Sequence, residues 1–268
     1  MIGVFDSGVG GLTVLHECLV SLPEEDYLYV GDSGYFPYGD KTVEELQRRS
    51  VAITTELLDR QVKLLVIACN SATAAAGQLV KEIGAAAGIP VITVVVPEAE
   101  IAAAITGNGR IGVLATPATV SSGAYRRALE EQGTPLRVTE VAAADLAAKI
   151  QNDLNFDHDL IEMVRGYCRP LQEAAVDTLI LGCTHYPLVA PLLQRILGRD
   201  VRLVSAGHAI AGAIQRELTW SGSIKRDTGE GDYRFLVTGD AADFTRDGTR
   251  FLQLPLAGRV ERTDIELS

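Results

Sequence analysis

The chain has 268 residues, 47% of them hydrophobic and 22% charged, which is typical of a soluble globular protein and long enough for one large domain or two modest ones. Its formal net charge of −11 argues against nucleic acid or an anionic membrane surface as a partner, because both are themselves negatively charged. The longest apolar stretch, residues 89–105, is broken by Pro97, Glu98 and Glu100, so no membrane-spanning segment is predicted.

The chain begins with an apolar, strand-like run, MIGVF, that no basic region or cleavage site precedes. We therefore expect a cytoplasmic protein, in which cysteine thiols stay reduced. The four cysteines, Cys18, Cys69, Cys168 and Cys183, form no CxxC pair. Buried or reactive thiols are therefore expected rather than disulfides.

Short apolar runs alternate with longer amphipathic stretches along the whole chain. The stretch from Thr42 to Arg60 is predicted to be a helix, because Thr42 and Glu45 have the spacing of a capping box and apolar residues line one face. This alternation predicts an α/β protein with mainly parallel sheets and helices on both faces. The runs expected to form strands are residues 2–5, 27–30, 63–68, 91–96, 110–115, 136–141, 177–182, 201–205 and 233–238.

Two parts of the chain resemble each other. Residues 2–8, IGVFDSG, are similar to residues 111–117, IGVLATP. Residues 63–71, KLLVIACNS, are similar to residues 177–185, DTLILGCTH, and each of these runs carries a cysteine where the strand ends. The similarity indicates two related α/β halves.

We interpret the halves as two doubly wound parallel-sheet domains, residues 1–94 plus 208–268 and residues 95–207. Ligands of such sheets bind just outside the carboxyl ends of the strands. The active site is therefore expected in the cleft between the domains, where Cys69 and Cys183 would face each other.

Cys69 and Cys183 both follow an apolar strand and precede a helical pattern. A thiol at the N-terminus of a helix feels the positive end of the helix dipole, so we expect the pKa of these thiols to fall from about 8.5 toward about 7. Two such thiols suit racemisation: one, as thiolate, removes a proton from a carbon, and the other delivers a proton to the opposite face. Cys18 and Cys168 lie inside helical patterns and are interpreted as buried residues.

Asp6 and His185 are the candidate ionisable partners of the thiols. Asp6 ends the first strand and could orient or deprotonate Cys69, receive a substrate ammonium group, or only cap the helix that follows. His185 stands two residues after Cys183 and could exchange a proton with it. An alternative is a zinc site formed by Cys69, Cys183 and His185, but the ligand spacing gives it no support, and no metal is expected.

Four segments, IGVFDSGVGGLTV, GDxxxxPYGDKT, ACNSATA and LGCTHYPL, resemble the signature segments of the glutamate racemases in the same order. The resemblance covers nearly the whole chain. It implies a two-domain aspartate/glutamate racemase fold and a cofactor-independent conversion of L- to D-glutamate for peptidoglycan. It also implies catalysis by Cys69 and Cys183, assisted by Asp6 and His185, and makes a homodimer the expected assembly. The substrate site that it implies consists of Asp6, Ser7, Tyr38, Gly39, Asn70, Ser71, Thr184 and His185.

The chain departs from the family pattern at several positions. Ser71 replaces a more common threonine, and Glu98 after VVVP is unusual. Ala143-Ala144 stand where the family has Cys-Pro, and Gln151 stands where it has a glutamate that assists the second cysteine. With Gln151, His185 would assist Cys183 alone, and the two directions of the reaction could differ in pH dependence.

Three other functions fit parts of the sequence. The first is a racemase of aspartate or another acidic amino acid. The second is a dehydrogenase with a pyrophosphate bound at the DSGVGG turn, although this turn lacks the last glycine of GxGxxG. The third is a catalytically impaired two-lobed binding protein that kept the cleft.

Overall fold

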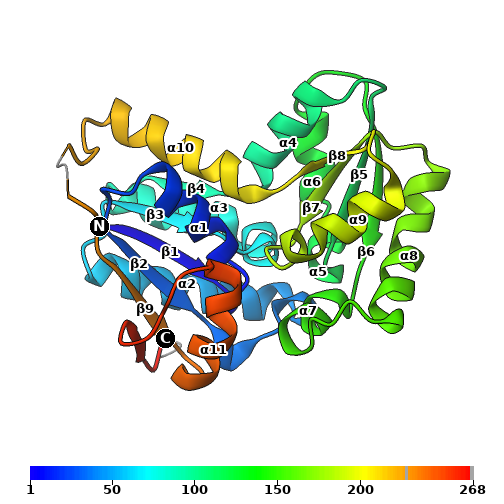
Figure 1. Cartoon of the computed structure of the whole chain (residues 1–268). Coiled ribbons are helices and arrows are strands. Elements are labelled where there is room, and N and C mark those ends of the chain that lie inside the picture. The colour runs from blue at the N-terminus through cyan, green and yellow to red at the C-terminus, as the bar shows by residue number, and fades with distance from the viewer. Residues whose placement is uncertain (227–228, 266–268) are drawn as a thin grey trace.

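The computed structural model describes residues 1–226 and 229–265 and contains two parallel β-sheets with helices packed on both faces of each (Figure 1). The first sheet has the strand order β10-β9-β2-β1-β3-β4 and the second has the order β6-β5-β7-β8. All neighbouring strands pair in parallel. The structure thereby confirms the predicted α/β class.

The strands are short, and the central ones are apolar and fully buried, as expected of parallel sheets covered on both faces. Those of the first sheet are β1 (Ile2–Asp6), β2 (Tyr27–Gly31), β3 (Leu64–Ile67), β4 (Val91–Thr93), β9 (Tyr233–Val237) and β10 (Val260–Arg262). Those of the second sheet are β5 (Arg110–Ala115), β6 (Arg137–Ala142), β7 (Thr178–Gly182) and β8 (Arg202–Val204).

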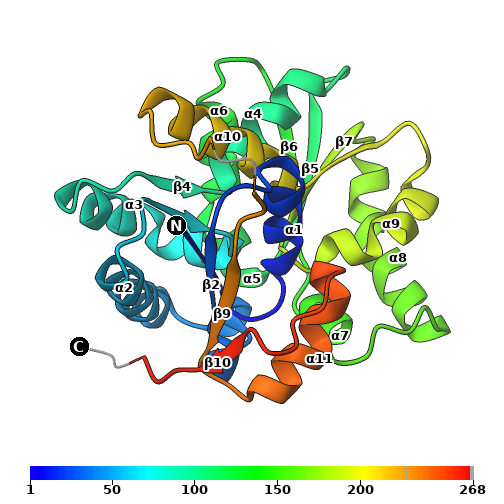
Figure 2. The same cartoon turned by 60° about the vertical axis from the view of Figure 1, so that its left-hand side comes forward.

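The helices divide between the two sheets (Figures 1 and 2). The first sheet is covered by α1 (Leu12–Ser21), α2 (Val43–Asp59), α3 (Asn70–Ala86), α10 (Ala206–Trp220) and α11 (Ala241–Leu252). Around the second sheet lie α4 (Val95–Ile105), α5 (Pro117–Ser122), α6 (Ala124–Glu130), α7 (Leu146–Asn152), α8 (His158–Glu173) and α9 (Ala190–Leu197). Short 3-10 turns are formed by Ser33–Tyr35, Tyr38–Asp40 and Tyr186–Val189. Within the described residues, no helix combines the length and apolarity needed to cross a bilayer.

All the predicted strands are present, but the prediction over residues 91–96 is wrong at its end. Strand β4 stops at Thr93, and Val95 already begins α4. Pro97 lies in the first turn of this helix, where a missing N–H costs nothing. The predicted capping box is confirmed, since the Glu45 amide donates to the Thr42 hydroxyl at 3.2 Å and the Thr42 amide to the Glu45 carboxylate at 2.9 Å.

The C-terminal strands complete the first sheet. Strand β9 pairs with β2, and β10 pairs with β9, so the chain returns to its first half after building the second sheet. Strand β1 ends at Asp6, β3 two residues before Cys69, β5 before Thr116 and β7 before Cys183. The carboxyl ends of strands from both sheets therefore supply residues to one region.

Candidate active site

One cavity contains side chains from both sheets and includes both candidate thiols. Cys69 is 5% exposed and Cys183 7% exposed. The cavity is closed down to about 20 Å³, which is room for about one water molecule. It is lined by Ser7, Phe36, Pro37, Tyr38, Gly39, Asp40, Cys69, Asn70, Ser71, Thr116, Ala144, Ala147, Ala148, Cys183, Thr184 and His185. Of the site residues predicted from the sequence, only Asp6 is missing from this lining.

Cys69 is the N-cap of α3. Its sulfur accepts a hydrogen bond from the Ala72 amide at 3.5 Å. Burial nevertheless raises the pKa of the Cys69 thiol to about 12, and the nearby Asp6 carboxylate acts in the same direction. The expected fall toward 7 is therefore wrong for this closed structure, because desolvation of the thiolate outweighs the helix dipole.

Cys183 forms a chain of contacts with His185 and Gln151. Its sulfur lies 3.8 Å from Nδ1 of His185, and Nε2 of His185 lies 2.9 Å from the side-chain oxygen of Gln151. Because an amide oxygen can only accept, Nε2 carries the imidazole proton, and Nδ1 is left to accept the proton of the thiol. Burial raises the pKa of Cys183 and lowers that of His185 to about 3. The pair therefore rests as neutral thiol and neutral imidazole.

Asp6 lies behind the cavity wall and is fully buried. It accepts hydrogen bonds from the Gly8 amide at 3.0 Å, the Ser7 hydroxyl at 3.3 Å and the Thr184 hydroxyl at 3.1 Å. Burial raises the pKa of this carboxyl to about 6. Asp6 thus connects the turn after β1 with Thr184, the residue after Cys183.

Tyr38 and Gly39 reach the cavity on a loop that Asp32 holds in place. The Asp32 carboxylate accepts hydrogen bonds from the Tyr38 hydroxyl at 2.5 Å and from the Thr238 hydroxyl at 2.6 Å. Arg49 of α2 forms a bidentate ion pair with the same carboxylate. These partners occupy both oxygens of the Asp32 carboxylate.

Ser71 connects the cavity to two threonines that the sequence interpretation missed. Its hydroxyl lies 2.9 Å from that of Thr116 and 3.4 Å from that of Thr119. The internal repeat could have identified Thr116, since it follows β5 as Ser7 and its neighbours follow β1. Phe36, Pro37 and Asp40 were also missed, although they adjoin the PYG segment in the sequence.

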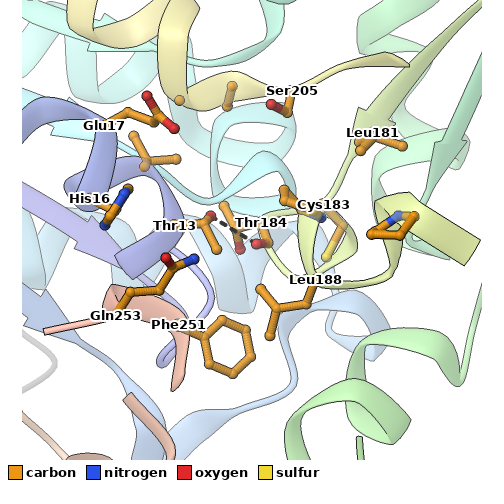
Figure 3. Close-up of a pocket in the computed structure, with 15 residues that line it drawn as sticks. Thr13, His16, Glu17, Leu181, Cys183, Thr184, Leu188, Ser205, Phe251 and Gln253 are labelled. Atoms are coloured by element: carbon orange, nitrogen blue, oxygen red, sulfur yellow. Dashed lines mark hydrogen bonds between the residues drawn. The ribbon is translucent and has the colours of Figure 1, made fainter. Parts of the chain in front are cut away.

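A second, wider pocket of about 310 Å³ lies on the other side of Cys183 and Thr184 (Figure 3). In the wall of this pocket, the Thr13 hydroxyl of α1 donates to the Thr184 carbonyl at 2.9 Å. Phe251 of α11 and Leu188 also line the pocket and lie below Thr13 and Thr184 in the view of Figure 3. Cys183 thus lines both of these pockets, whereas Cys69 lines the narrow cavity and not the wider pocket.

Fold and site together define an α/β protein in which two parallel sheets each bring one thiol to a shared cavity. A model of the Asp/Glu/hydantoin racemase family matches residues 12–214. The chain is 41% identical over 258 residues to a glutamate racemase of Mycobacterium tuberculosis, a match that covers 96% of this chain and 94% of the relative.

Solved structures agree with this match. A glutamate racemase isoform of Bacillus anthracis superposes with a TM-score of 0.94 at 37% identity, covering 100% of this chain and 98% of that one. A glutamate racemase of Francisella tularensis, solved in complex with D-glutamate, has a TM-score of 0.92 at 31% identity, with 99% and 97% covered. The chain therefore belongs to the Asp/Glu/hydantoin racemase family, within its glutamate racemases, and is an amino-acid racemase, an isomerase. A nicotinamide-dependent dehydrogenase is no longer a candidate.

Proposed function

We propose that the protein interconverts L- and D-glutamate without a cofactor, with Cys69 and Cys183 as the two acid/base residues. The observation that carries the proposal is that the two thiols line one closed cavity from different sheets. Glutamate as the substrate is supported by the relatives, one of which was solved with D-glutamate bound. Peptidoglycan synthesis as the consumer of D-glutamate, a homodimeric assembly and a cytoplasmic location belong to the same proposal.

The reaction needs one thiolate and one thiol at a time. The thiolate takes the Cα proton and becomes a thiol, the electron pair stays on the substrate as a carbanion, and the other thiol protonates the opposite face and becomes the thiolate. The two cysteines have then exchanged protonation states, and the reverse turnover restores them. The Ala72 amide at the start of α3 donates to the Cys69 sulfur and thereby stabilises the thiolate form of this residue.

The high thiol pKa values of the closed structure set a condition on this chemistry. Burial favours the protonated thiol at both Cys69 and Cys183. A substrate ammonium group brings a positive charge beside the sulfurs, and an opposite charge at close range lowers the pKa of a thiol. The substrate therefore helps to form the thiolate that removes its Cα proton.

The test is incubation with L-glutamate in D₂O without added cofactor, with NMR of Cα deuteration and chiral chromatography as readouts. We expect deuterium in the D-enantiomer, and a loss of racemisation by at least about 10³-fold in Cys69→Ala and in Cys183→Ala, because each removes an essential proton carrier. Cys18→Ala is the matched control, since Cys18 is a buried thiol of α1 outside the site.

Different outcomes separate the alternatives. Unimpaired racemisation in either cysteine variant would contradict the two-thiol mechanism. Faster turnover of aspartate than of glutamate would assign the enzyme to another acidic amino acid. Binding of glutamate without any exchange of the Cα proton would indicate the impaired binding protein.

A further inference from the structure

A buried carboxylate, Glu98, lies beside the candidate active site and has no part in the proposed proton transfer. It is 0% exposed, in the first turn of α4. Within the described residues it forms no ion pair, and its Oε1 atom has no hydrogen-bond partner. Burial raises its pKa to about 8. An acid in such a place costs stability, which calls for a compensating role.

The Oε2 atom of Glu98 organises a three-membered hydrogen-bonded group. It accepts from the hydroxyl of Tyr125, on α6, in a short hydrogen bond, and from Nδ2 of Asn70, on α3, at 3.1 Å. Nδ2 of Asn70 also donates to the Tyr125 hydroxyl oxygen at 2.7 Å. Nδ2 of Asn70 therefore faces two oxygens of this group, one from Glu98 and one from Tyr125.

This arrangement fixes the orientation of the Asn70 amide. Turning the amide over would bring Oδ1 against Oε2 of Glu98 and against a Tyr125 oxygen whose proton is already donated to Glu98. With the proton of the neutral Glu98 carboxyl on Oε1, two hydrogen bonds would become contacts between acceptors. In the observed orientation, Oδ1 of Asn70 is buried and has no partner among the described residues.

Asn70 is itself part of the cavity wall, directly after Cys69. A donor that enters the cavity beside Asn70 would supply the hydrogen bond that this buried carbonyl oxygen lacks. An acidic amino acid carries two carboxylates, which at neutral pH only accept, and one ammonium group, which donates. That ammonium group is bonded to the Cα atom that Cys69 has to reach.

We propose that Glu98 is a positioning residue that turns Asn70 into a hydrogen-bond acceptor for the α-ammonium group of the substrate. The inference rests on the proposed function, in that an amino acid occupies the cavity. Glu98 does not touch the substrate and acts through Asn70, with Tyr125 as the third member of the group. The group also joins the two halves of the molecule, because α3 covers the first sheet whereas α4 and α6 lie against the second.

The test compares glutamate with glutarate, which has the same two carboxylates and lacks the ammonium group. The measured quantities are the KM for glutamate and the inhibition constant for glutarate. In Glu98→Ala we expect the KM for glutamate to rise about tenfold. This is the effect of losing one charge-assisted hydrogen bond, the one between the substrate ammonium group and Asn70. The inhibition constant should stay within about twofold. Glu98→Gln should retain the selectivity of the wild type, because its amide oxygen can accept from the same two donors. The matched control is Glu100→Ala, an exposed acid of the same helix.

A double-mutant cycle tests whether Glu98 acts through Asn70. In an Asn70→Ala background, Glu98→Ala should change the KM by less than about twofold. A full additional tenfold rise would overturn the proposal. Should Glu98→Ala fail to fold, Tyr125→Phe gives the same comparison, because it removes the second acceptor of Nδ2. Equal weakening of glutamate and glutarate in these variants, or no change in either, would also overturn it.

Failure of this inference is distinguishable from failure of the proposed function. A wild-type enzyme that does not racemise glutamate contradicts the proposed function. The other case is a wild-type enzyme that racemises glutamate while Glu98→Ala leaves the preference for glutamate over glutarate unchanged. That result contradicts only the role of Glu98.

Discussion

The imidazole of His185 is held by an uncharged partner, which limits its strength as a base. Gln151 accepts its Nε2 proton, and burial holds the pKa of the ring at about 3. Above that pH the imidazole is neutral, so it can accept the Cys183 hydrogen bond but has little capacity to take the proton. The structure places Gln151 beside His185, the residue that the resemblance to the family pattern leads us to expect to assist Cys183.

Gln151→Glu should strengthen this base. A carboxylate at hydrogen-bond distance from Nε2 stabilises the protonated ring, so the pKa of His185 should rise by about 1–3 units. Racemisation in the direction in which Cys183 removes the Cα proton should then become faster. This increase should occur at pH values above the pKa of the new carboxyl group. NMR titration of the histidine rings and kcat/KM in both directions against pH would measure this.

The control for that variant is Gln172→Glu, which adds the same charge at an exposed position of α8. An unchanged titration of His185 in Gln151→Glu would show that residue 151 does not control the ring.

At the level of single residues, the sequence predicted those side chains that follow a strand directly. Cys69, Asn70, Cys183 and Thr184 could be placed in this way, because carboxyl ends of parallel strands share one edge. The group of Asn70, Glu98 and Tyr125 could not, since its members are 28 and 55 residues apart and only packing joins them. The sequence also does not show that the two thiols are buried. For this reason it predicts a lowered thiol pKa, whereas burial raises it.

Among the elements, the loop between β2 and α2 shows how one ion pair positions part of a site. The Asp32 side chain is 0% exposed and pairs with Arg49, whose side chain is 11% exposed. Asp32 also holds the Tyr38 hydroxyl, and Tyr38 and Gly39 line the cavity. Helix α2 therefore determines where this loop meets the substrate.

Arg49→Ala should both destabilise the protein and weaken substrate binding. It leaves the Asp32 carboxylate buried without its cation, which costs about 3–5 kcal/mol in the free energy of unfolding. The KM should rise because the loop loses its anchor. Urea denaturation and steady-state kinetics would measure the two effects. Arg48→Ala, at an exposed neighbouring position of α2, should stay within about 0.5 kcal/mol of the wild type. Superimposable unfolding curves for Arg49→Ala and the wild type would contradict this account.

The elements were more predictable than the contacts between them. Buried parallel strands are continuous apolar runs, and this signal located every strand that was predicted. It misled at residues 94–96, where three valines resemble a strand but begin α4. It missed β10, which has three residues, two of them charged.

In the molecule as a whole, the narrow cavity implies that residues lining it have to move before an amino acid enters. About 20 Å³ cannot admit an amino acid. Several hydrogen bonds cross between the halves at this place, among them Thr13 to Thr184 and Ser71 to Thr116, and they oppose such a movement. Such local opening costs less than global unfolding.

Alkylation with iodoacetamide, followed by peptide mapping, would separate local opening from unfolding. Cys69 and Cys183 should react slowly without denaturant, because they are nearly buried and only the open form exposes them. Their rates should rise with pH, since raised pKa values keep the thiolate fraction small, and saturating glutamate should slow them. Cys18 and Cys168, both 0% exposed within helices, should react only when urea unfolds the chain. If Cys69 reacted as slowly as Cys18, the cavity would open only through unfolding, and rapid racemisation would then require a different route for the substrate.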